Sequence, residues 1–272
     1  MTARPRVLIF DSGVGGLTVL AAARQVRPDA RFVYAADNAA FPYGDLSEQQ
    51  LIRRVLAVVG RLIDHVAPDV TVIACNTAST LALGALRDTF DLPFVGTVPA
   101  IKVAAETTRS GVVGVLATPA TVNREYTKGL IAAFARSCDV HLVGARGLAA
   151  IAEAKLAGEA IDRVAIAREI APAFVDAGGR RTDTIVLACT HYPLIAEEIA
   201  AAAPWPVALI DPSAAIARRI AHFIGPAPAA VETMADGTAV FTAPERIGAQ
   251  LAGVLSRFGL ASVEGIEVGP VG

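Results

Sequence analysis

The expected fold is decided by one stretch, Val70-Thr71-Val72-Ile73-Ala74-Cys75-Asn76-Thr77-Ala78-Ser79. A short apolar run rich in β-branched residues is followed at once by polar and small residues, which indicates a buried strand that turns directly into a helix. A second stretch, Thr184-Ile185-Val186-Leu187-Ala188-Cys189-Thr190-His191, has the same character. Each cysteine is therefore expected at the carboxyl end of a buried strand.

Similar apolar runs recur along the chain and alternate with alanine-rich segments of helical period. This alternation predicts an α/β fold with parallel strands that are covered on both faces. The predicted strands are Arg6–Phe10, Arg31–Ala36, Val70–Cys75, Phe94–Val98, Val112–Ala117, Val140–Val143, Thr184–Cys189 and Val207–Ile210. The predicted helices are Leu17–Gln25, Glu48–His65, Thr77–Asp88, Pro99–Thr108, Pro119–Ala135, Ile161–Ala177, Leu194–Ala203 and Ala214–Phe223.

Composition excludes several classes of function. The chain has 272 residues, 54% of them hydrophobic, and a formal charge of −2, so a nucleic-acid surface is not expected. The N-terminal apolar run is too short for a secretory signal, and no apolar run reaches the ~18 residues that a membrane span needs. We therefore expect a cytoplasmic protein without a membrane partner.

Three widely spaced cysteines and four scattered histidines predict neither a disulfide framework nor a metal site. Cysteine often serves as a small buried hydrophobe. Two cysteines at matching strand ends, each beside Asn or Thr, instead favour reactive thiols, because a helix N-terminus stabilises a thiolate. Cys138 lies outside such a context, and no function is assigned to it.

Two titratable residues lie close to these thiols in the sequence pattern. His191 follows Cys189 by two residues and can accept or return its proton, although it can also be a simple turn histidine. Asp11 ends the first predicted strand and can act in the same way near Cys75, or serve as a helix cap.

The loop Asp11-Ser12-Gly13-Val14-Gly15-Gly16-Leu17 follows the first predicted strand, as a dinucleotide-binding loop does. Its spacing fails the G-x-G-x-x-G pattern, because the third glycine position is Thr18. The loop glycines equally allow backbone N–H groups to approach a small carboxylate.

A weak internal echo relates the two halves of the chain. Ile73–Thr77 resembles Leu187–His191, and Val7–Ser12 resembles Val207–Ser213. Apolar strands that end in polar residues are common, so the residues alone leave open whether this echo is a true repeat.

Taken together, these motifs resemble the glutamate racemase family of the aspartate/glutamate racemase superfamily. The matching pieces, which extend over essentially the whole chain, are Asp11–Leu17, Ala36-Asp37-Asn38, Pro42-Tyr43-Gly44, Ala74–Ser79 and Ala188-Cys189-Thr190-His191-Tyr192-Pro193. One departure is that many family members carry Ile-Glu-Pro where this chain has Thr97-Val98-Pro99, so a role for that glutamate is not expected here.

The resemblance implies two pseudo-symmetric α/β domains with mainly parallel sheets and the active site at their interface. The first would comprise residues 1–98 and 210–272, and the second residues 99–209. It also implies interconversion of L- and D-glutamate without cofactor or metal, supplying D-glutamate for peptidoglycan, and a homodimer. Some relatives bind DNA gyrase, but nothing in this sequence supports gyrase or nucleic-acid binding.

By the same resemblance, Cys75 and Cys189 would be the catalytic acid/base pair, assisted by Asp11 and His191 respectively. The residues that would bind substrate are Ser12, Tyr43, Gly44, Asn76, Thr77, Thr121 and Thr190. Glu153 resembles a family glutamate near the site, in surroundings that differ from the family's.

Three alternative functions remain. An aspartate racemase is the nearest, but relatives specific for aspartate tend to have an acidic residue at the position of His191. A non-catalytic interaction protein would not need both thiols. A nucleotide-dependent oxidoreductase conflicts with the failed glycine pattern.

Overall fold

The computed structural model describes residues 4–227 and 237–269. Its strands are β1 (Arg6–Asp11), β2 (Arg31–Ala36), β3 (Val70–Ile73), β4 (Phe94–Gly96), β5 (Val112–Ala117), β6 (Asp139–Gly144), β7 (Asp176–Ala177), β8 (Arg180–Arg181), β9 (Thr184–Ala188), β10 (Ala208–Ile210), β11 (Gly237–Phe241) and β12 (Leu260–Gly265). Its α-helices are α1 (Leu17–Val26), α2 (Glu48–Val66), α3 (Asn76–Thr89), α4 (Ile101–Thr107), α5 (Pro119–Val122), α6 (Glu125–Phe134), α7 (Leu148–Ala157), α8 (Arg163–Ile170), α9 (Ala196–Ala202), α10 (Ser213–Phe223) and α11 (Ala249–Arg257). Short 3₁₀ turns are η1 (Tyr43–Asp45), η2 (Ala171–Ala173), η3 (Tyr192–Ile195) and η4 (Pro244–Arg246).

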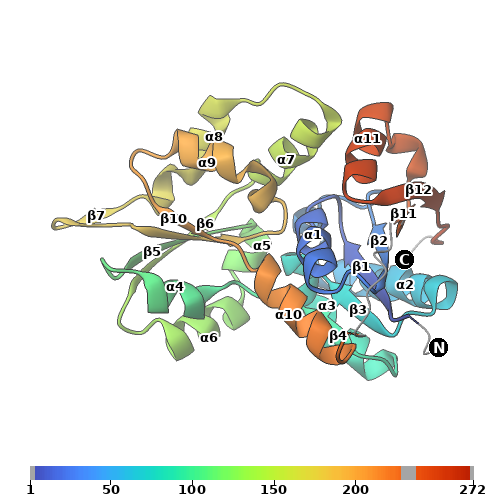
Figure 1. Cartoon of the computed structure of the whole chain (residues 1–272). Coiled ribbons are helices and arrows are strands. Elements are labelled where there is room, and N and C mark those ends of the chain that lie inside the picture. The colour runs from blue at the N-terminus through green and yellow to red at the C-terminus, as the bar shows by residue number, and fades with distance from the viewer. Residues whose placement is uncertain (1–3, 228–236, 270–272) are drawn as a thin grey trace.

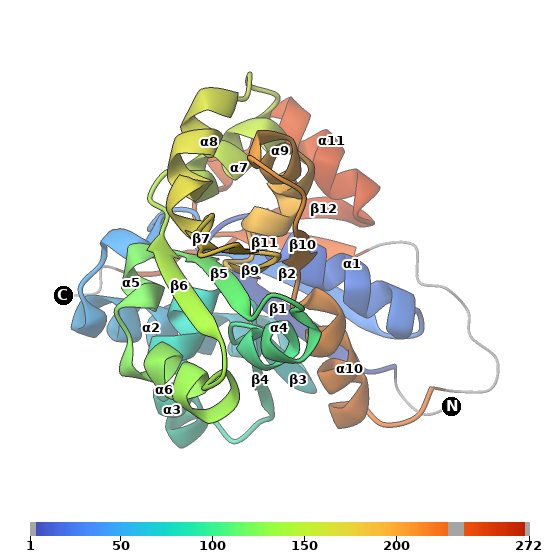
Figure 2. The same cartoon turned by 90° about the vertical axis from the view of Figure 1, so that its left-hand side faces the viewer.

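Two parallel sheets form the framework of the molecule. The six-stranded sheet has the order β12-β11-β2-β1-β3-β4, and the four-stranded sheet has the order β10-β9-β5-β6. The two sheets lie side by side, with the four-stranded one on the left in Figure 1, and Figure 2 gives the view from that side. The predicted α/β fold with parallel sheets is confirmed.

The two sheets share one topology. Four neighbouring strands of the larger sheet, β2-β1-β3-β4, match β6-β5-β9-β10 of the smaller one in chain order and position. The strand that precedes Cys75 therefore corresponds to the strand that precedes Cys189, as the first echo suggested. The second suggested similarity, between Val7–Ser12 and Val207–Ser213, was wrong as an equivalence of position, because β1 corresponds to β5, whereas β10 corresponds to β4.

Helices cover both faces of each sheet because the strand side chains alternate between two apolar layers. Val7 and Ile9 of β1 pack with α1, α10 and α11, while Leu8 and Phe10 pack with α2 and α3. In the smaller sheet α4 and α6 cover one face, and α7, α8 and α9 cover the other. Both cores therefore fix the strand ends firmly.

Several predicted elements have different bounds. The predicted helix Pro119–Ala135 is two helices, α5 and α6, because the backbone of Arg124 between them is extended. The predicted helix Ile161–Ala177 was wrong beyond Ile170, since Asp176–Ala177 forms β7 of a small hairpin. Gly178 and Gly179 make its turn with φ of 65° and 90°, a backbone region that favours glycine.

Four further elements, α7, β11, α11 and β12, were absent from the sequence prediction. The last three return the chain to the larger sheet, where β11 pairs with β2 (Figure 1). Strand β10 pairs with β9 in the smaller sheet, and α10 packs against α1. The proposed domain boundaries remain a prediction. No helix in the described part of the chain is long and apolar enough to cross a membrane.

Candidate active site

Asp11 lies where the carboxyl ends of the strands of the two sheets meet, and its side chain contacts groups from both sheets. Its side chain is fully buried, and one carboxylate oxygen accepts a hydrogen bond from the backbone N–H of Ser12 at 2.7 Å. The other oxygen accepts from the backbone N–H of Gly16 and, at 3.1 Å, from the hydroxyl of Thr190 in the smaller sheet. Because the carboxyl ends of parallel strands carry these groups, both sheets contribute to one site.

Cys75 caps α3 at the carboxyl end of β3. Its sulfur accepts from the backbone N–H of Ala78 at 3.5 Å and lies 3.7 Å from the hydroxyl of Ser12. Burial, followed by the negative charge of Asp11, raises the pKa of the Cys75 thiol far above its ordinary value, and the charge of Cys189 adds to the effect. Cys75 is therefore favoured as a neutral thiol in this arrangement.

Cys189 lies at the carboxyl end of β9 and faces an imidazole. The Nδ1 atom of His191 is 3.9 Å from its sulfur, and the Nε2 atom is 2.7 Å from Oε1 of Glu153 on α7. A carboxylate oxygen only accepts hydrogen bonds, so Nε2 carries a proton. Nδ1 is then the nitrogen that faces the Cys189 thiol and can exchange a proton with it.

The protonation of His191 follows from these contacts. Burial by itself disfavours the charged ring, but the hydrogen bonds with Cys189 and Glu153, together with the charge of Asp11, outweigh it and raise the pKa of His191 well above its ordinary value. His191 therefore holds a proton that it can exchange with the sulfur of Cys189.

Three threonines bridge the sheets on the side of Cys75. The hydroxyl of Thr77 lies 3.1 Å from that of Thr118, which in turn lies 3.0 Å from that of Thr121. Thr118 follows β5, the counterpart of β1, and thus occupies the place that Ser12 has in the larger sheet. Gly44 is close by, since a Cβ built there would lie 3.9 Å from Cβ of Thr118.

Asn76 has a buried amide that is not satisfied by the protein. Its residue is 2% exposed, and neither the oxygen nor the nitrogen of its side chain has a hydrogen-bond partner among the described residues. A buried amide without partners is costly, so a polar ligand at this position would complete the site.

The Asp/Glu/Hydantoin racemase family model matches residues 18–220. The chain is 57% identical over 215 residues to the glutamate racemase of Brucella ovis, covering 79% of this chain and 78% of the relative. It also resembles the structure of the Escherichia coli glutamate racemase in complex with L-glutamate and the activator UDP-MurNAc-Ala, with a TM-score of 0.89 and 44% identity over 98% of this chain and 100% of that one.

The chain belongs to the Asp/Glu/hydantoin racemase family. A third likeness, to the glutamate racemase of Aquifex pyrophilus, has a TM-score of 0.71 and 31% identity and covers 98% of this chain and 97% of the other. The resemblance inferred from the sequence motifs is confirmed, and the protein is an isomerase of the racemase class.

The predicted site residues of this racemase gather where the two sheets meet, with one qualification. The hydroxyl of Tyr43 donates to Asp37 at 2.7 Å, and the same carboxylate is held by the guanidinium of Arg54 and the hydroxyl of Thr242. Burial and Asp37 raise the pKa of Tyr43 well above its ordinary value. Any substrate contact of this residue would therefore use its backbone or ring, and the assigned roles remain predictions.

Two members of this racemase site were missed or underrated by the sequence. The position of Thr118 directly after the predicted strand Val112–Ala117 makes it a candidate for the site, but it was not among the residues assigned to substrate binding. Glu153 was ranked low, yet it contacts His191 directly. Val98 occupies the position at which many family members have the glutamate of Ile-Glu-Pro. It is 39% exposed, and Pro99 follows it before α4.

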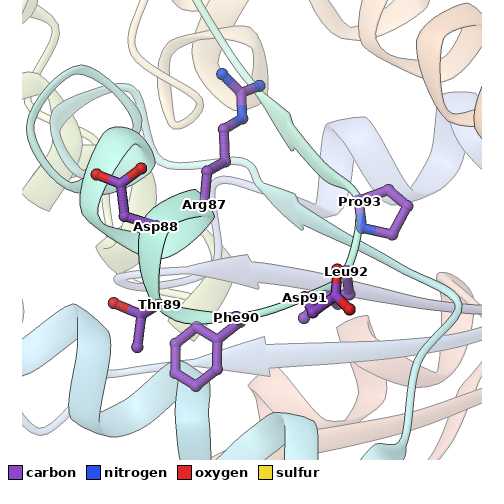
Figure 3. A pocket seen from close by; sticks show the side chains of 7 residues that line it. All are labelled: Arg87, Asp88, Thr89, Phe90, Asp91, Leu92 and Pro93. Carbon is purple, nitrogen blue, oxygen red and sulfur yellow. The ribbon is translucent and has the colours of Figure 1, made fainter.

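A separate hollow lies at the turn between α3 and β4 of the racemase. Figure 3 shows its lining, which consists of Arg87, Asp88, Thr89, Phe90, Asp91, Leu92 and Pro93. These residues precede β4, whereas the thiols follow the carboxyl ends of β3 and β9. The hollow is therefore distinct from the candidate active site.

Proposed function

We propose that this racemase interconverts L- and D-glutamate in the cytoplasm with Cys75 and Cys189 as opposed acid and base, and supplies D-glutamate for peptidoglycan. The observation that carries the proposal is the pair of buried thiols at equivalent strand ends of two facing sheets. The Brucella ovis relative and the two structural neighbours named above, all glutamate racemases, support glutamate as the substrate.

Racemisation requires that the α-proton leave one face of the substrate and that a proton arrive on the other. With L-glutamate, Cys189 as thiolate would take the α-proton, and the Cys75 thiol would donate one to the opposite face. The preference of buried Cys75 for its neutral form supports its role as the acid in this direction. With D-glutamate the two roles reverse.

Helper groups would supply and remove protons at each sulfur. His191 lies next to Cys189 and can relay its proton toward Glu153. On the other side, the hydroxyl of Ser12 lies between Cys75 and a carboxylate oxygen of Asp11, at 3.7 Å and 3.5 Å. Asp11 would thus act on Cys75 through Ser12.

The substrate carbanion needs hydrogen-bond donors because no cofactor spreads its charge in this proposal. The unsatisfied amide of Asn76 is one such donor, and the hydroxyls of Thr77, Thr121 and Thr190 line the same junction. Since Asn76, Thr77 and Thr190 are each at most 3% exposed, glutamate would enter only when the two sheets move apart.

The proposal is tested with dialysed, chelator-treated protein incubated separately with L-glutamate and L-aspartate in deuterated water. We expect D-glutamate that carries deuterium at its α-carbon, little deuterium in the remaining L-glutamate at early times, and much slower turnover of aspartate. Preferred turnover of aspartate would assign the chain to aspartate racemisation, and loss of activity without added metal or pyridoxal phosphate would contradict the two-thiol mechanism.

A further inference from the structure

The loop between β1 and α1 of the larger sheet contacts the proton-transfer groups of the smaller sheet. The backbone N–H of Val14 donates to Oε1 of Glu153 at 2.7 Å, and this same oxygen accepts from Nε2 of His191 at 2.7 Å. Val14 is 1% exposed, with its side chain in the core formed with α1. Its N–H group is therefore fixed by the packing of the larger sheet.

Glycines flank Val14 at the points of closest approach. A Cβ built on Gly13 would lie 2.1 Å from Oε1 of Glu153 and 3.0 Å from Nε2 of His191. A Cβ on Gly15 would lie 2.5 Å from Nδ1 of His191 and 2.7 Å from its backbone nitrogen. Neither glycine has a positive φ, so what these positions require is the absence of a side chain.

We propose that the segment Gly13-Val14-Gly15 is a positioning element that holds Glu153, and through it His191, in register with Cys189 of the opposite sheet. This inference rests on the proposed function and names the residues that prepare one of its two bases. The loop makes no proton transfer itself. Its N–H group holds the carboxylate that orients the imidazole.

The two thiols consequently differ in which sheet supplies the groups that assist their proton transfer. Ser12 and the Ala78 amide, which lie within hydrogen-bond distance of the Cys75 sulfur, belong to the same sheet as Cys75. The orientation of His191 at Cys189 depends on a group from the other sheet. Cys189 is therefore fully assisted only when the sheets are apposed as in this structure.

The test separates the two proton abstractions. From a 3-chloroglutamate, removal of the α-proton expels chloride and leaves an enamine, which water converts to 2-oxoglutarate and ammonium, so only the abstracting thiol is needed. Chloride release from the L and D enantiomers then reports on Cys189 and Cys75 separately. We expect Gly13→Ala to slow release from the L enantiomer by about tenfold or more, because positioned acid–base assistance is typically worth ~10²–10⁴-fold.

Release from the D enantiomer should change by less than about twofold, since the Cys75 contacts are untouched. Gly129→Ala in α6 is the matched control, because a Cβ there has no neighbour within 4 Å, and it should behave as the wild type. Unchanged release from the L enantiomer in Gly13→Ala, or equal loss from both enantiomers, would overturn the inference.

Comparison with Glu153→Ala decides the route of the effect. Shortening Glu153 removes the atom that the new methyl group would approach most closely, at 2.1 Å, and leaves only contacts of 3.0 Å or more. The double variant Gly13→Ala/Glu153→Ala should therefore release chloride from the L enantiomer as slowly as Glu153→Ala alone. A further loss in the double variant would contradict the inference, and this comparison serves even if Gly13→Ala alone does not fold. Failure of the wild type to racemise glutamate would instead refute the proposed function.

Discussion

At the residue scale, Cys75 links burial to the pH dependence of stability. Burial and Asp11 raise its pKa in the folded protein, whereas an unfolded chain exposes a thiol with a pKa of about 8.5. Above that pH the unfolded state loses a proton that the folded state keeps. The stabilisation is complete below pH ~8.5 and is lost as pH rises, by up to about 1.4 kcal/mol per pH unit for one thiol.

Urea unfolding of the wild type and of Cys75→Ala between pH 8 and about 9, where few tyrosines of the unfolded chain are ionised, measures this loss. The free energy of unfolding should fall less steeply with pH in the variant. Parallel curves would show that the Cys75 thiol ionises as readily in the folded protein as in the unfolded chain.

A second prediction at the residue scale concerns the two cysteines and the residues Asp11 and His191, each of which would assist one of them. Cys75→Ser and Cys189→Ser should each abolish measurable racemisation, because a hydroxyl is a far weaker acid than a thiol. Asp11→Asn should chiefly slow turnover of D-glutamate and His191→Asn that of L-glutamate, each by roughly 10²-fold or more.

Initial rates in both directions give kcat and KM for each enantiomer. Because the equilibrium constant between enantiomers is one, the ratio kcat/KM must stay equal in the two directions, so the asymmetry should appear in kcat and KM individually. Normal racemisation in either serine variant would refute the assigned catalytic pair.

Sequence alone predicted site residues where a chemically reactive side chain directly follows a buried strand. Cys75, Cys189 and His191 could be singled out because a polar residue directly after a buried apolar run is visible in the sequence. The cross-sheet contact of Glu153 with Val14 could not, since it joins residues 139 positions apart through a backbone N–H group. Such a contact depends on how the two sheets face each other.

At the element scale, α2 ends in an unfavourable conformation. Ala67, the residue after the helix, is exposed and has φ 46° and ψ 62°, the left-handed region in which a Cβ is strained. We expect Ala67→Gly to increase the free energy of unfolding by about 0.5–1 kcal/mol. Chemical denaturation measures the change, and racemase activity should be unaffected.

Ala57→Gly, within the same helix, is the matched control. There glycine gains nothing from its freedom and should lower the free energy of unfolding by about 1 kcal/mol. Destabilisation by Ala67→Gly would mean that the end of α2 does not adopt this conformation in solution.

Helix α7 shows why some elements were missed. Its sequence, Leu-Ala-Ala-Ile-Ala-Glu-Ala-Lys-Leu-Ala, has apolar residues spread around the whole helix and no amphipathic stripe. The helix is buried against the core of the smaller sheet, and its Leu156 packs on the larger one. A helix between two packed surfaces lacks the polar face on which periodicity depends.

At the scale of the whole molecule, closure of the site has a consequence for thiol reactivity. Cys75 and Cys189 are each 6% exposed, whereas Cys138 is partly accessible. In the native protein we expect iodoacetamide to label Cys138 first, and the other two only as fast as the sheets separate. Saturating glutamate should slow labelling of Cys75 and Cys189 further.

Peptide mass spectrometry over a time course distinguishes the three thiols. Labelling of Cys75 or Cys189 at the rate seen in urea would mean that the site is open in solution.

Sedimentation of the unlabelled protein tests the expected homodimer. A monomer at all protein concentrations would contradict that expectation.

The order of strands in the larger sheet also bears on how the protein is made. Strands β11 and β12 come last in the chain, yet β11 lies beside β2, which is finished early. During synthesis β2 therefore remains an uncovered edge until the whole smaller sheet has left the ribosome. An unpaired edge of this kind is a template for wrong pairing with other chains, so we expect the nascent protein to be prone to aggregation during that interval.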